Sequence, residues 1–435
     1  DGIAAGIGMV HQHFMLVPVF TVAENVILGV EPTGPLGYLD MKRARAEVEE
    51  INRKYGLEVP ADALIEDLPV GIQQRVEILK VLFRSADVLI LDEPTAVLTP
   101  QEVEDFFGIV RSLRDAGKAI VFITHKLHEI LAISDRINVL RQGRITGEGD
   151  PKSVTEAELA EMMVGRPVSF TVEKAPASPG RAMLEMEAVS MLDDNDELVL
   201  EEVSMTVRAG EIVGIAGVQG NGQTELVEVI TGLERASAGR ILFDGTDITH
   251  ASVRERHRLG MAHIPEDRLK SGMIASFTIA ENMVLNSYYD EEYSRGPSID
   301  WKHVQETAAA FCVDFDVRTP SVFLPAGNLS GGNQQKMVVA RELERATKLV
   351  VASQPTRGLD VGSIEYIHKR LVGARDAGNG VLIVSSELDE IMGLSDRILV
   401  MFDGRIVAEF DNTGGQADRN AVGLAMAGAN EGAAA

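Results

Sequence analysis

The sequence predicts an α/β protein of two tandem domains, each with a mostly parallel sheet covered by helices on both faces. One observation is the alternation of short apolar runs, at 88–91, 119–123, 349–352 and 381–384, with helical stretches such as 100–116. The other is a set of motifs that occurs twice, with its copies separated by 261 residues (329 minus 68). A repeat of such long period indicates two similar units.

The domain boundaries follow from composition. We expect a first domain at 1–168, a linker at 169–182, a second domain at 183–428 and a tail at 429–435. Pro176 and Pro179 lie in the linker among small residues, which favours an extended connector. The tail is rich in glycine and alanine, which is typical of a frayed terminus.

Bulk composition excludes several classes of protein. The formal net charge of −25 argues against a nucleic-acid partner, which requires a basic surface. A single cysteine, Cys312, excludes an internal disulfide framework, and we interpret it as a small buried hydrophobe. No run approaches the roughly 18 apolar residues that span a bilayer, so we expect no transmembrane segment in this chain.

A phosphate-binding loop is predicted near the start of the second domain. The strand at 211–216 runs into a Gly-x-x-Gly-x-Gly-x-Thr pattern, followed by a helix. Glycines let backbone amides close around phosphate oxygens, and a helix N-terminus adds a favourable dipole. The nucleotide-binding candidates are Gly217, Gly220, Asn221, Gly222, Gln223 and Thr224. The alternative is a glycine-rich turn without a ligand.

Two positions in this loop carry specific expectations. Thr224 stands where a hydroxyl would ligate Mg²⁺, and we regard it as a weak metal ligand. Gln223 replaces the lysine that would reach the β- and γ-phosphates, and its neutral amide cannot offset developing charge. Nucleotide binding is therefore plausible at this loop, whereas efficient hydrolysis is not.

Catalytic candidates follow two strands of the first domain. The strand at 88–91 ends in Asp92 and Glu93, and the strand at 119–123 is followed by His125. Asp92 would hold Mg²⁺, Glu93 would polarise the attacking water, and His125 could contact the γ-phosphate. An acidic turn and a structural histidine are the alternatives for each residue alone, but their joint spacing favours the catalytic interpretation.

A second anion site is predicted at the start of a helix in the second domain. The segment Leu-Ser-Gly-Gly-Asn-Gln-Gln at 329–335 would present the Ser330 hydroxyl and the backbone amides of Gly331 and Gly332 at a helix N-terminus. A plain helix N-cap is the alternative for this string alone.

Together these motifs closely resemble the ATP-binding subunits of ABC transporters, over nearly all of residues 1–428. The segments His-Gln-His-Phe-Met-Leu at 11–16, Thr-Val-Ala-Glu-Asn at 21–25 and Pro-Glu-Asp-Arg at 265–268 look like the double-headed ATPase of bacterial importers for simple sugars and nucleosides. The first of these segments leans towards the nucleoside branch rather than the ribose or galactose branch.

The resemblance implies two P-loop NTPase cores, each with a helical subdomain, that sandwich two nucleotides head to tail. One site would use Gln12, Asp92, Glu93 and His125 together with Ser330, Gly331 and Gly332; Gln12 would assist catalysis and share the Mg²⁺ ion with Asp92. In the other site Gln223 replaces lysine, Ser353 and Gln354 replace the acidic pair, Ser386 replaces histidine, and Pro69, Val70 and Gly71 replace Ser-Gly-Gly. Thr99 stands where the family has an aspartate, which the second domain keeps as Asp360.

The resemblance also implies function and partners. ATP and Mg²⁺ would be the cofactors of a hydrolase that powers import of a small solute. The protein would dock integral-membrane permease subunits at the cytoplasmic face of the cell membrane, and an extracytoplasmic solute-binding protein would act through the permease.

Two other functions remain open. A soluble tandem ATPase that acts on ribosomes is disfavoured by the short linker and the degenerate site. A catalytically silent nucleotide-binding fragment is the other, because Gly217 precedes Thr278 by 61 residues (278 minus 217), whereas only 20 precede the matching Thr21. We therefore expect the first domain to be N-terminally truncated and to lack its own phosphate loop.

Overall fold

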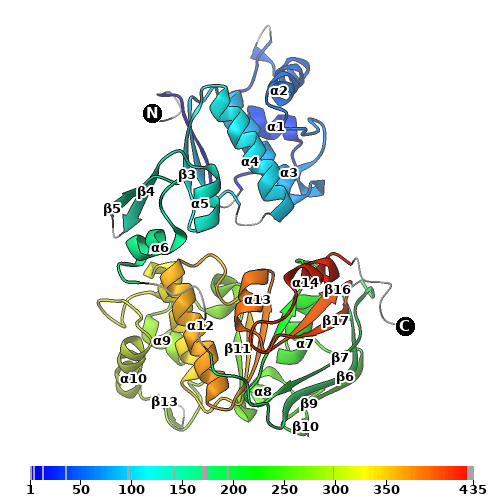
Figure 1. Cartoon of the computed structure of the whole chain (residues 1–435), viewed down its shortest axis with the longest axis vertical. Coiled ribbons are helices and arrows are strands. Elements are labelled where there is room, and N and C mark those ends of the chain that lie inside the picture. Colours follow the sequence, from blue (N-terminus) through cyan, green and yellow to red (C-terminus); the bar gives the residue numbers. More distant parts are fainter. Residues whose placement is uncertain are drawn as a thin grey trace. The chain divides into compact units, whose positions relative to one another are not determined.

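The computed structural model describes residues 2, 5–11, 14–34, 37–95, 98, 100–141, 143–167, 172, 174–193, 195–296 and 298–428. The chain divides into two compact units, residues 1–168 (unit 1) and 169–435 (unit 2), which Figure 1 traces in sequence order. Each unit has its own hydrophobic core and is described by itself.

Unit 1 is built around a three-stranded parallel sheet, in the order β1-β2-β3, with a separate antiparallel hairpin of β4 and β5. Its strands are β1 (Ile7–Val10), β2 (Val88–Asp92), β3 (Ala119–Ile123), β4 (Ile137–Arg141) and β5 (Arg144–Gly149). Its helices are α1 (Val22–Ile27), α2 (Met41–Tyr55), α3 (Val70–Phe83), α4 (Pro100–Asp115), α5 (Leu127–Ile133) and α6 (Glu156–Val164).

The sheet of unit 1 is buried on one face. Leu89 and Leu91 of β2 are fully buried in the core that α3 and α4 also line. On β3, however, Val121 is 49% and Ile123 45% exposed. The prediction of a strand buried on both faces is therefore wrong for β3, because its outer residues contact no covering layer among the described parts of unit 1.

Unit 2 contains a six-stranded sheet in the order β11-β14-β15-β8-β16-β17 and a four-stranded antiparallel sheet in the order β10-β9-β6-β7. Its strands are β6 (Ala182–Leu192), β7 (Leu198–Arg208), β8 (Ile212–Ala216), β9 (Ala238–Phe243), β10 (Thr246–Asp247), β11 (Met261–Ile264), β12 (Ser294–Arg295), β13 (Ser298–Ile299), β14 (Leu349–Ser353), β15 (Gly380–Ser385), β16 (Arg397–Phe402) and β17 (Arg405–Asp411). Its helices are α7 (Gln223–Thr231), α8 (Val253–Leu259), α9 (Ile279–Met283), α10 (Trp301–Asp314), α11 (Gly331–Leu343), α12 (Val361–Asp376), α13 (Leu388–Leu394) and α14 (Arg419–Met426).

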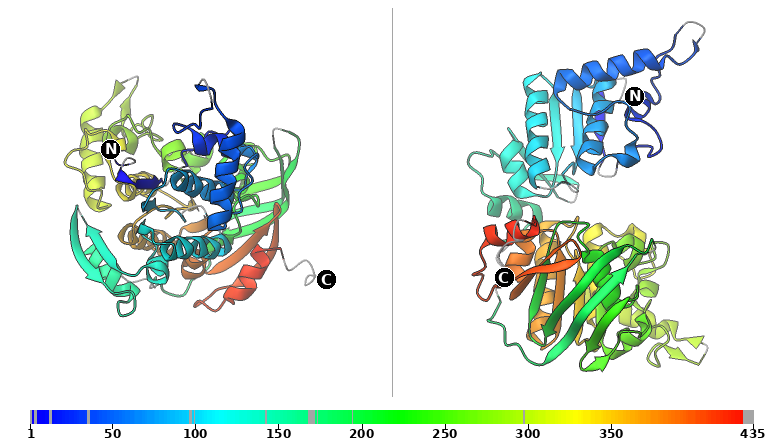
Figure 2. Two further views of the ribbon diagram at one scale, coloured as in Figure 1. Left: turned by 90° about the horizontal axis from the view of Figure 1, so that it is seen from above. Right: turned by 90° about the vertical axis from the view of Figure 1, so that its right-hand side faces the viewer.

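The central strands of unit 2 are buried along their whole length. Every residue of β8, β14 and β15 is buried, as expected where layers cover both faces of a parallel sheet. The long strands β6 and β7 form a separate layer, drawn in green in the right-hand view of Figure 2. Cys312 of α10 is buried in the core, and burial raises the pKa of its thiol to about 11, so the thiol is protonated at neutral pH.

The two units share local structure as well as sequence motifs. Thr21 caps α1 and Thr278 caps α9, each in a capping box with the glutamate three residues later. Four residues after each threonine, a buried asparagine forms hydrogen bonds with the backbone of the preceding loop. Asn25 donates to the Val17 carbonyl at 3.1 Å, and Asn282 donates to the Ile274 carbonyl at 2.9 Å. Both segments therefore fold through the same hydrogen bonds.

Strand pairing decides where functional side chains gather. β2 pairs with β3 in parallel, and β14 pairs with β15, which pairs with β8. Because the carboxyl ends of neighbouring parallel strands meet at one edge of a sheet, residues that follow these strands lie close together. Within the described residues, none of the helices combines the length and hydrophobicity that crossing a bilayer requires.

Candidate functional site

In unit 1, an acid and a histidine meet at the ends of β2 and β3. Glu93 follows β2, and its backbone amide donates to the Ile123 carbonyl at 2.8 Å, which ties the strand ends together. Its carboxylate Oε1 lies 2.9 Å from Nδ1 of His125. Both side chains are partly exposed, at 23% and 20%. The pair is thus preorganised and open to a ligand.

Charge holds Glu93 in its ionised form. The hydrogen bond from His125 is the main cause that lowers the pKa of Glu93; the positive charges of His125 and Lys126 add to it, while burial opposes it. An ionised carboxylate can orient and polarise a water molecule, although a lowered pKa makes it a weaker proton acceptor.

The corresponding place in unit 2 has the same shape without ionisable groups. Gln354 follows β14, and its amide donates to the Val384 carbonyl at 2.7 Å. The backbone amide and the hydroxyl of Ser386 donate to Oε1 of Gln354, at 3.2 and 3.3 Å. A neutral amide cannot take a proton from water, so this pair has no general base.

The backbone around both pairs is the same. Glu93 has φ of 44° and Gln354 has φ of 46°, so each occupies the left-handed region that costs a side-chain-bearing residue free energy. A buried threonine hydroxyl then bonds a buried glutamate at 2.7 Å in each unit, Thr95 to Glu129 and Thr356 to Glu390. The two places therefore share a backbone and differ in their side chains, with Glu93 and His125 in one and Gln354 and Ser386 in the other.

The predicted phosphate loop connects β8 to α7, and its glycines are required by geometry. A Cβ on Gly217 would lie 2.8 Å from the Met401 carbonyl. Gly220 and Gly222 have φ of 92° and 97°, which only glycine adopts readily. Gly222 is also the N-cap of α7, so the loop presents its backbone at a helix N-terminus.

Gln223 lies inside this loop. Its side chain is buried; Oε1 accepts the Asn221 amide at 3.2 Å, and Nε2 donates to the Val218 carbonyl at 3.1 Å. Asn221 also connects the loop to the turn after β16, because its Oδ1 accepts a hydrogen bond from the Asp403 backbone amide at 3.1 Å. Thr224 is exposed at the start of α7. The loop is therefore held in shape by its own amides, with a neutral group at the position expected for lysine.

The predicted anion site at the start of α11 has an additional cation. Ser330 is the N-cap of α11, and its exposed hydroxyl accepts a hydrogen bond from Asn333 at 2.9 Å. A Cβ on Gly331 would lie 2.7 Å from Nη2 of Arg268, so the guanidinium lies directly against this turn. Gly332 is buried.

Arg268 is the residue that sequence reasoning did not assign to the site. Its Nε donates to Gln334 at 3.2 Å, and burial lowers the pKa of its guanidinium. Its position in the segment 265–268 was the available signal. The equivalent first turn of α3 has Pro69 as N-cap and no capping side chain. Gln12 and Thr99 lie outside the described residues.

The Mg²⁺ candidates differ between the units. Asp92 ends β2 as a partly buried carboxylate beside Glu93, which suits a hard cation. In unit 2 the same place is Ser353, which is buried and neutral, and the exposed hydroxyl of Thr224 is the other candidate. Two hydroxyl groups are a poor ligand set for Mg²⁺, so only the unit 1 residues fit this ion.

Known proteins are similar to this chain over most of its length. A family model described as ABC transporter matches residues 2–96 and 200–357. The chain is 50% identical to the nucleoside import ATP-binding protein NupA of Lactococcus lactis, over 92% of this chain and 79% of that protein.

Two further relatives are similar over almost the whole chain. The guanosine import ATP-binding protein NupO of Bacillus subtilis is 48% identical, over 98% of this chain and 83% of that protein. A glucose import ATP-binding protein of Haloferax volcanii is 44% identical, over 99% and 83% respectively. The chain therefore belongs to the ABC transporter ATP-binding proteins and is an ATP hydrolase of that class.

Proposed function

We propose that this protein hydrolyses ATP at a single centre in unit 1 and holds nucleotide in unit 2, and so powers import of a small solute through a membrane permease. The observation that carries the proposal is the matched pair of strand ends. Glu93 with His125 in unit 1, and Gln354 with Ser386 in unit 2, share one backbone geometry but not one chemistry.

The roles in unit 1 follow from position and charge. Glu93 is ionised and orients the attacking water, and His125 holds the carboxylate and is itself partly exposed. Asp92, with Gln12, would hold Mg²⁺, which when bound neutralises charge on the phosphates. Within unit 2, Ser330, Gly331 and Gly332 would form a separate anion site at the start of α11, with Arg268 beside it.

In unit 2, the loop from Gly217 to Thr224 would bind nucleotide without turning it over. Its backbone is arranged for phosphate, but Gln223 brings no positive charge to the developing transition state. The absence of a carboxylate at Ser353 and Gln354 removes the metal ligand and the base together.

The solute is proposed to be a nucleoside. NupA and NupO are named for nucleoside and guanosine import, and both are more similar to this chain than the glucose import protein is. Integral-membrane permease subunits would carry the solute, a solute-binding protein would deliver it outside, and this protein would act at the cytoplasmic face. Uptake of labelled guanosine and of labelled glucose by vesicles with the complete transporter would separate the two solutes.

The test of the hydrolytic assignment is Glu93→Gln in the full-length protein, with Gln354→Glu as its mirror image. Loss of a preorganised transition-state contact costs roughly 10²–10³ in rate, so Glu93→Gln should reduce ATP turnover by that factor. Gln354→Glu should leave turnover within about twofold of wild type, because Ser353 and Ser386 remain neutral. Wild-type turnover by Glu93→Gln would contradict the proposal.

A further inference from the structure

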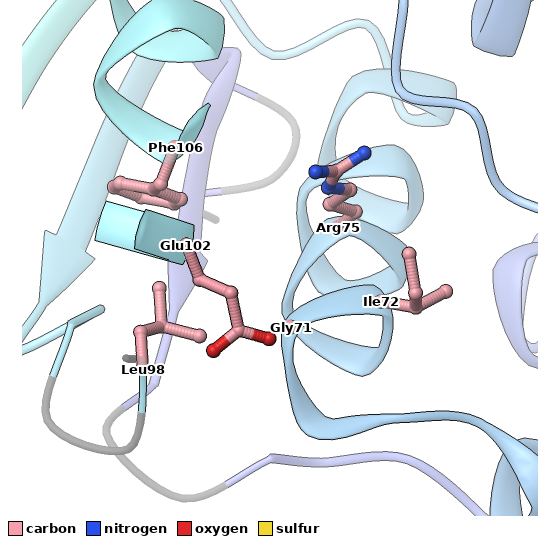
Figure 3. A pocket seen from close by; sticks show the side chains of 6 residues that line it. All are labelled: Gly71, Ile72, Arg75, Leu98, Glu102 and Phe106. Atoms are coloured by element: carbon pink, nitrogen blue, oxygen red, sulfur yellow. The ribbon is translucent and has the colours of Figure 1, made fainter. Parts of the chain in front are cut away.

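A glycine in the first turn of α3 lies close to α4, and a glycine in the first turn of α11 lies close to α12. In unit 2, a Cβ added to Gly332 would lie 2.2 Å from Oγ of Ser363 and 3.0 Å from Oδ2 of Asp360. In unit 1, a Cβ added to Gly71 would lie 2.4 Å from Oε1 of Glu102. Figure 3 shows the Glu102 carboxylate pointing at this turn of α3. A side chain at Gly332 would displace the capping pair of Ser363 and Asp360, whereas one at Gly71 would displace the end of the Glu102 side chain.

The two positions near the glycine carry an acid followed by a hydroxyl residue in unit 2, and a hydroxyl residue followed by an acid in unit 1. Asp360 is the N-cap of α12, and its carboxylate accepts the Ser363 amide at 3.0 Å and the Ser363 hydroxyl at 2.8 Å. The equivalent sequence in unit 1 has Thr99 for Asp360 and Glu102 for Ser363 (363 minus 261). A carboxylate oxygen therefore reaches the glycine in both units, from positions three residues apart.

The contact between α3 and α4 in unit 1 also contains an ion pair that the contact between α11 and α12 in unit 2 replaces with a cation–π pair. Arg75, one turn after Gly71, lies 3.8 Å from Asp105 of α4. At the equivalent positions of unit 2, the Lys336 ammonium lies 4.7 Å from the centre of the Tyr366 ring. A cavity of about 50 Å³ separates the two helices of unit 1 and is lined by Gly71, Ile72, Arg75, Leu98, Glu102 and Phe106.

We propose that Glu102 is a positioning residue that takes over in unit 1 the work of the aspartate missing at position 99. Its carboxylate clamps the first turn of α4 to the first turn of α3. Because α4 begins seven residues after Glu93 (100 minus 93), a fixed α4 also fixes the strand end that carries the catalytic pair. The clamp stands on the contact with Gly71, whereas its effect on turnover rests on the proposed function.

The test exchanges the two side chains in the full-length protein. Glu102→Ser removes the acid, and Thr99→Asp with Glu102→Ser restores the residue types that unit 2 has at Asp360 and Ser363. The single variant should lower kcat for ATP by about 2- to 30-fold, the usual range for a coupling residue, with KM little changed. The double variant should recover most of the lost rate, which a residue needed only for its bulk would not allow.

A second readout follows the clamp without activity. The amides of Ile72 and Gln73 both donate to the Pro69 carbonyl at 3.0 Å, so their hydrogen exchange reports on the first turn of α3. Exchange should accelerate in Glu102→Ser and in the isosteric Glu102→Gln, and return in the double variant. Glu104→Ser, an exposed acid on the same helix, is the matched control and should change neither readout.

Each outcome decides the proposal. Wild-type kcat together with wild-type exchange in Glu102→Ser would overturn it, as would a double variant as slow as the single one. If Glu102→Ser does not fold, Glu102→Gln provides the same comparison. Full turnover by Glu93→Gln would remove the proposed function, but faster exchange at Ile72 and Gln73 would still support the clamp.

Discussion

The ends of β2 and β14 are the same structure with different chemistry. Each turns through a left-handed residue whose amide bonds the next strand, and each is followed by a buried threonine–glutamate bond. Unit 1 places Glu93 and His125 on this scaffold, whereas unit 2 places Gln354 and Ser386 there. One backbone scaffold therefore carries two sets of side chains, an acid with a histidine in unit 1 and an amide with a hydroxyl in unit 2.

The largest effect on this comparison is expected from making unit 1 resemble unit 2 at one residue. His125→Ser should lower ATP turnover by roughly 10², because His125 holds the Glu93 carboxylate and is itself partly exposed beside it. Ser386→His, the reverse change, should not raise turnover, because Gln354 cannot act as a base. Steady-state ATPase assays of both variants would test this. Unchanged turnover in His125→Ser, or increased turnover in Ser386→His, would contradict the assignment of hydrolysis to unit 1.

The pH profile sharpens the same prediction. The pKa of Glu93 is lowered, chiefly by the hydrogen bond from His125. The stability and activity that depend on the ionised carboxylate are therefore present above the ordinary glutamate pKa and lost only as pH falls through the lower folded value. Without His125, burial is the remaining large influence and raises the pKa, so the acid limb of the ATPase profile should move to higher pH. An unmoved acid limb would contradict the assignment.

A smaller effect is expected from restoring a charge to the loop of unit 2. Gln223→Lys should tighten nucleotide binding there by roughly tenfold, because a charge-assisted hydrogen bond to phosphate is about twice as strong as a neutral one. Turnover should not rise, because Ser353 and Gln354 are unchanged. Titration with a fluorescent ATP analogue, with Gln223→Met as the uncharged control, measures the change; equal affinities of the two variants would refute it.

The smallest effect is expected from relieving the left-handed turn. Gln354→Gly should raise the free energy of unfolding by up to about 1 kcal/mol, because glycine adopts a φ near 46° without steric cost. Gln354→Ala, which loses the same side chain and keeps the strain, is the control and should be less stable than wild type. Chemical unfolding of unit 2 in both variants provides the measurement. A glycine variant no more stable than the alanine variant would show that the turn stores no strain.

The sequence predicted the fold class because its cues were local. Apolar runs of β-strand length, glycine spacing and helix-capping residues each depend on neighbours in the chain. The family and its ATP hydrolase activity were likewise correct, since several motifs at fixed spacing carry them together. The open face of β3 could not be predicted, because Val121 and Ile123 read as core residues whatever lies against them.

The parts of the site that escaped prediction depend on contacts between distant segments. Arg268 lies against Gly331, 63 residues away (331 minus 268), and although the segment 265–268 marked Arg268 as notable, its contact with that turn required the structure. Glu102 reads as an ordinary acid in the first turn of a helix until its contact with Gly71 is known. The left-handed backbone of Glu93 and Gln354 is equally invisible, because neither residue type favours it.

We propose that the protein turns over one bound nucleotide while it keeps the other. The most direct test is to load the full-length protein with labelled ATP and Mg²⁺, remove free nucleotide, and identify what remains bound over several turnover times. We expect one nucleotide per molecule to be converted to ADP and a second to be recovered as ATP. Conversion of both at the same rate would contradict it.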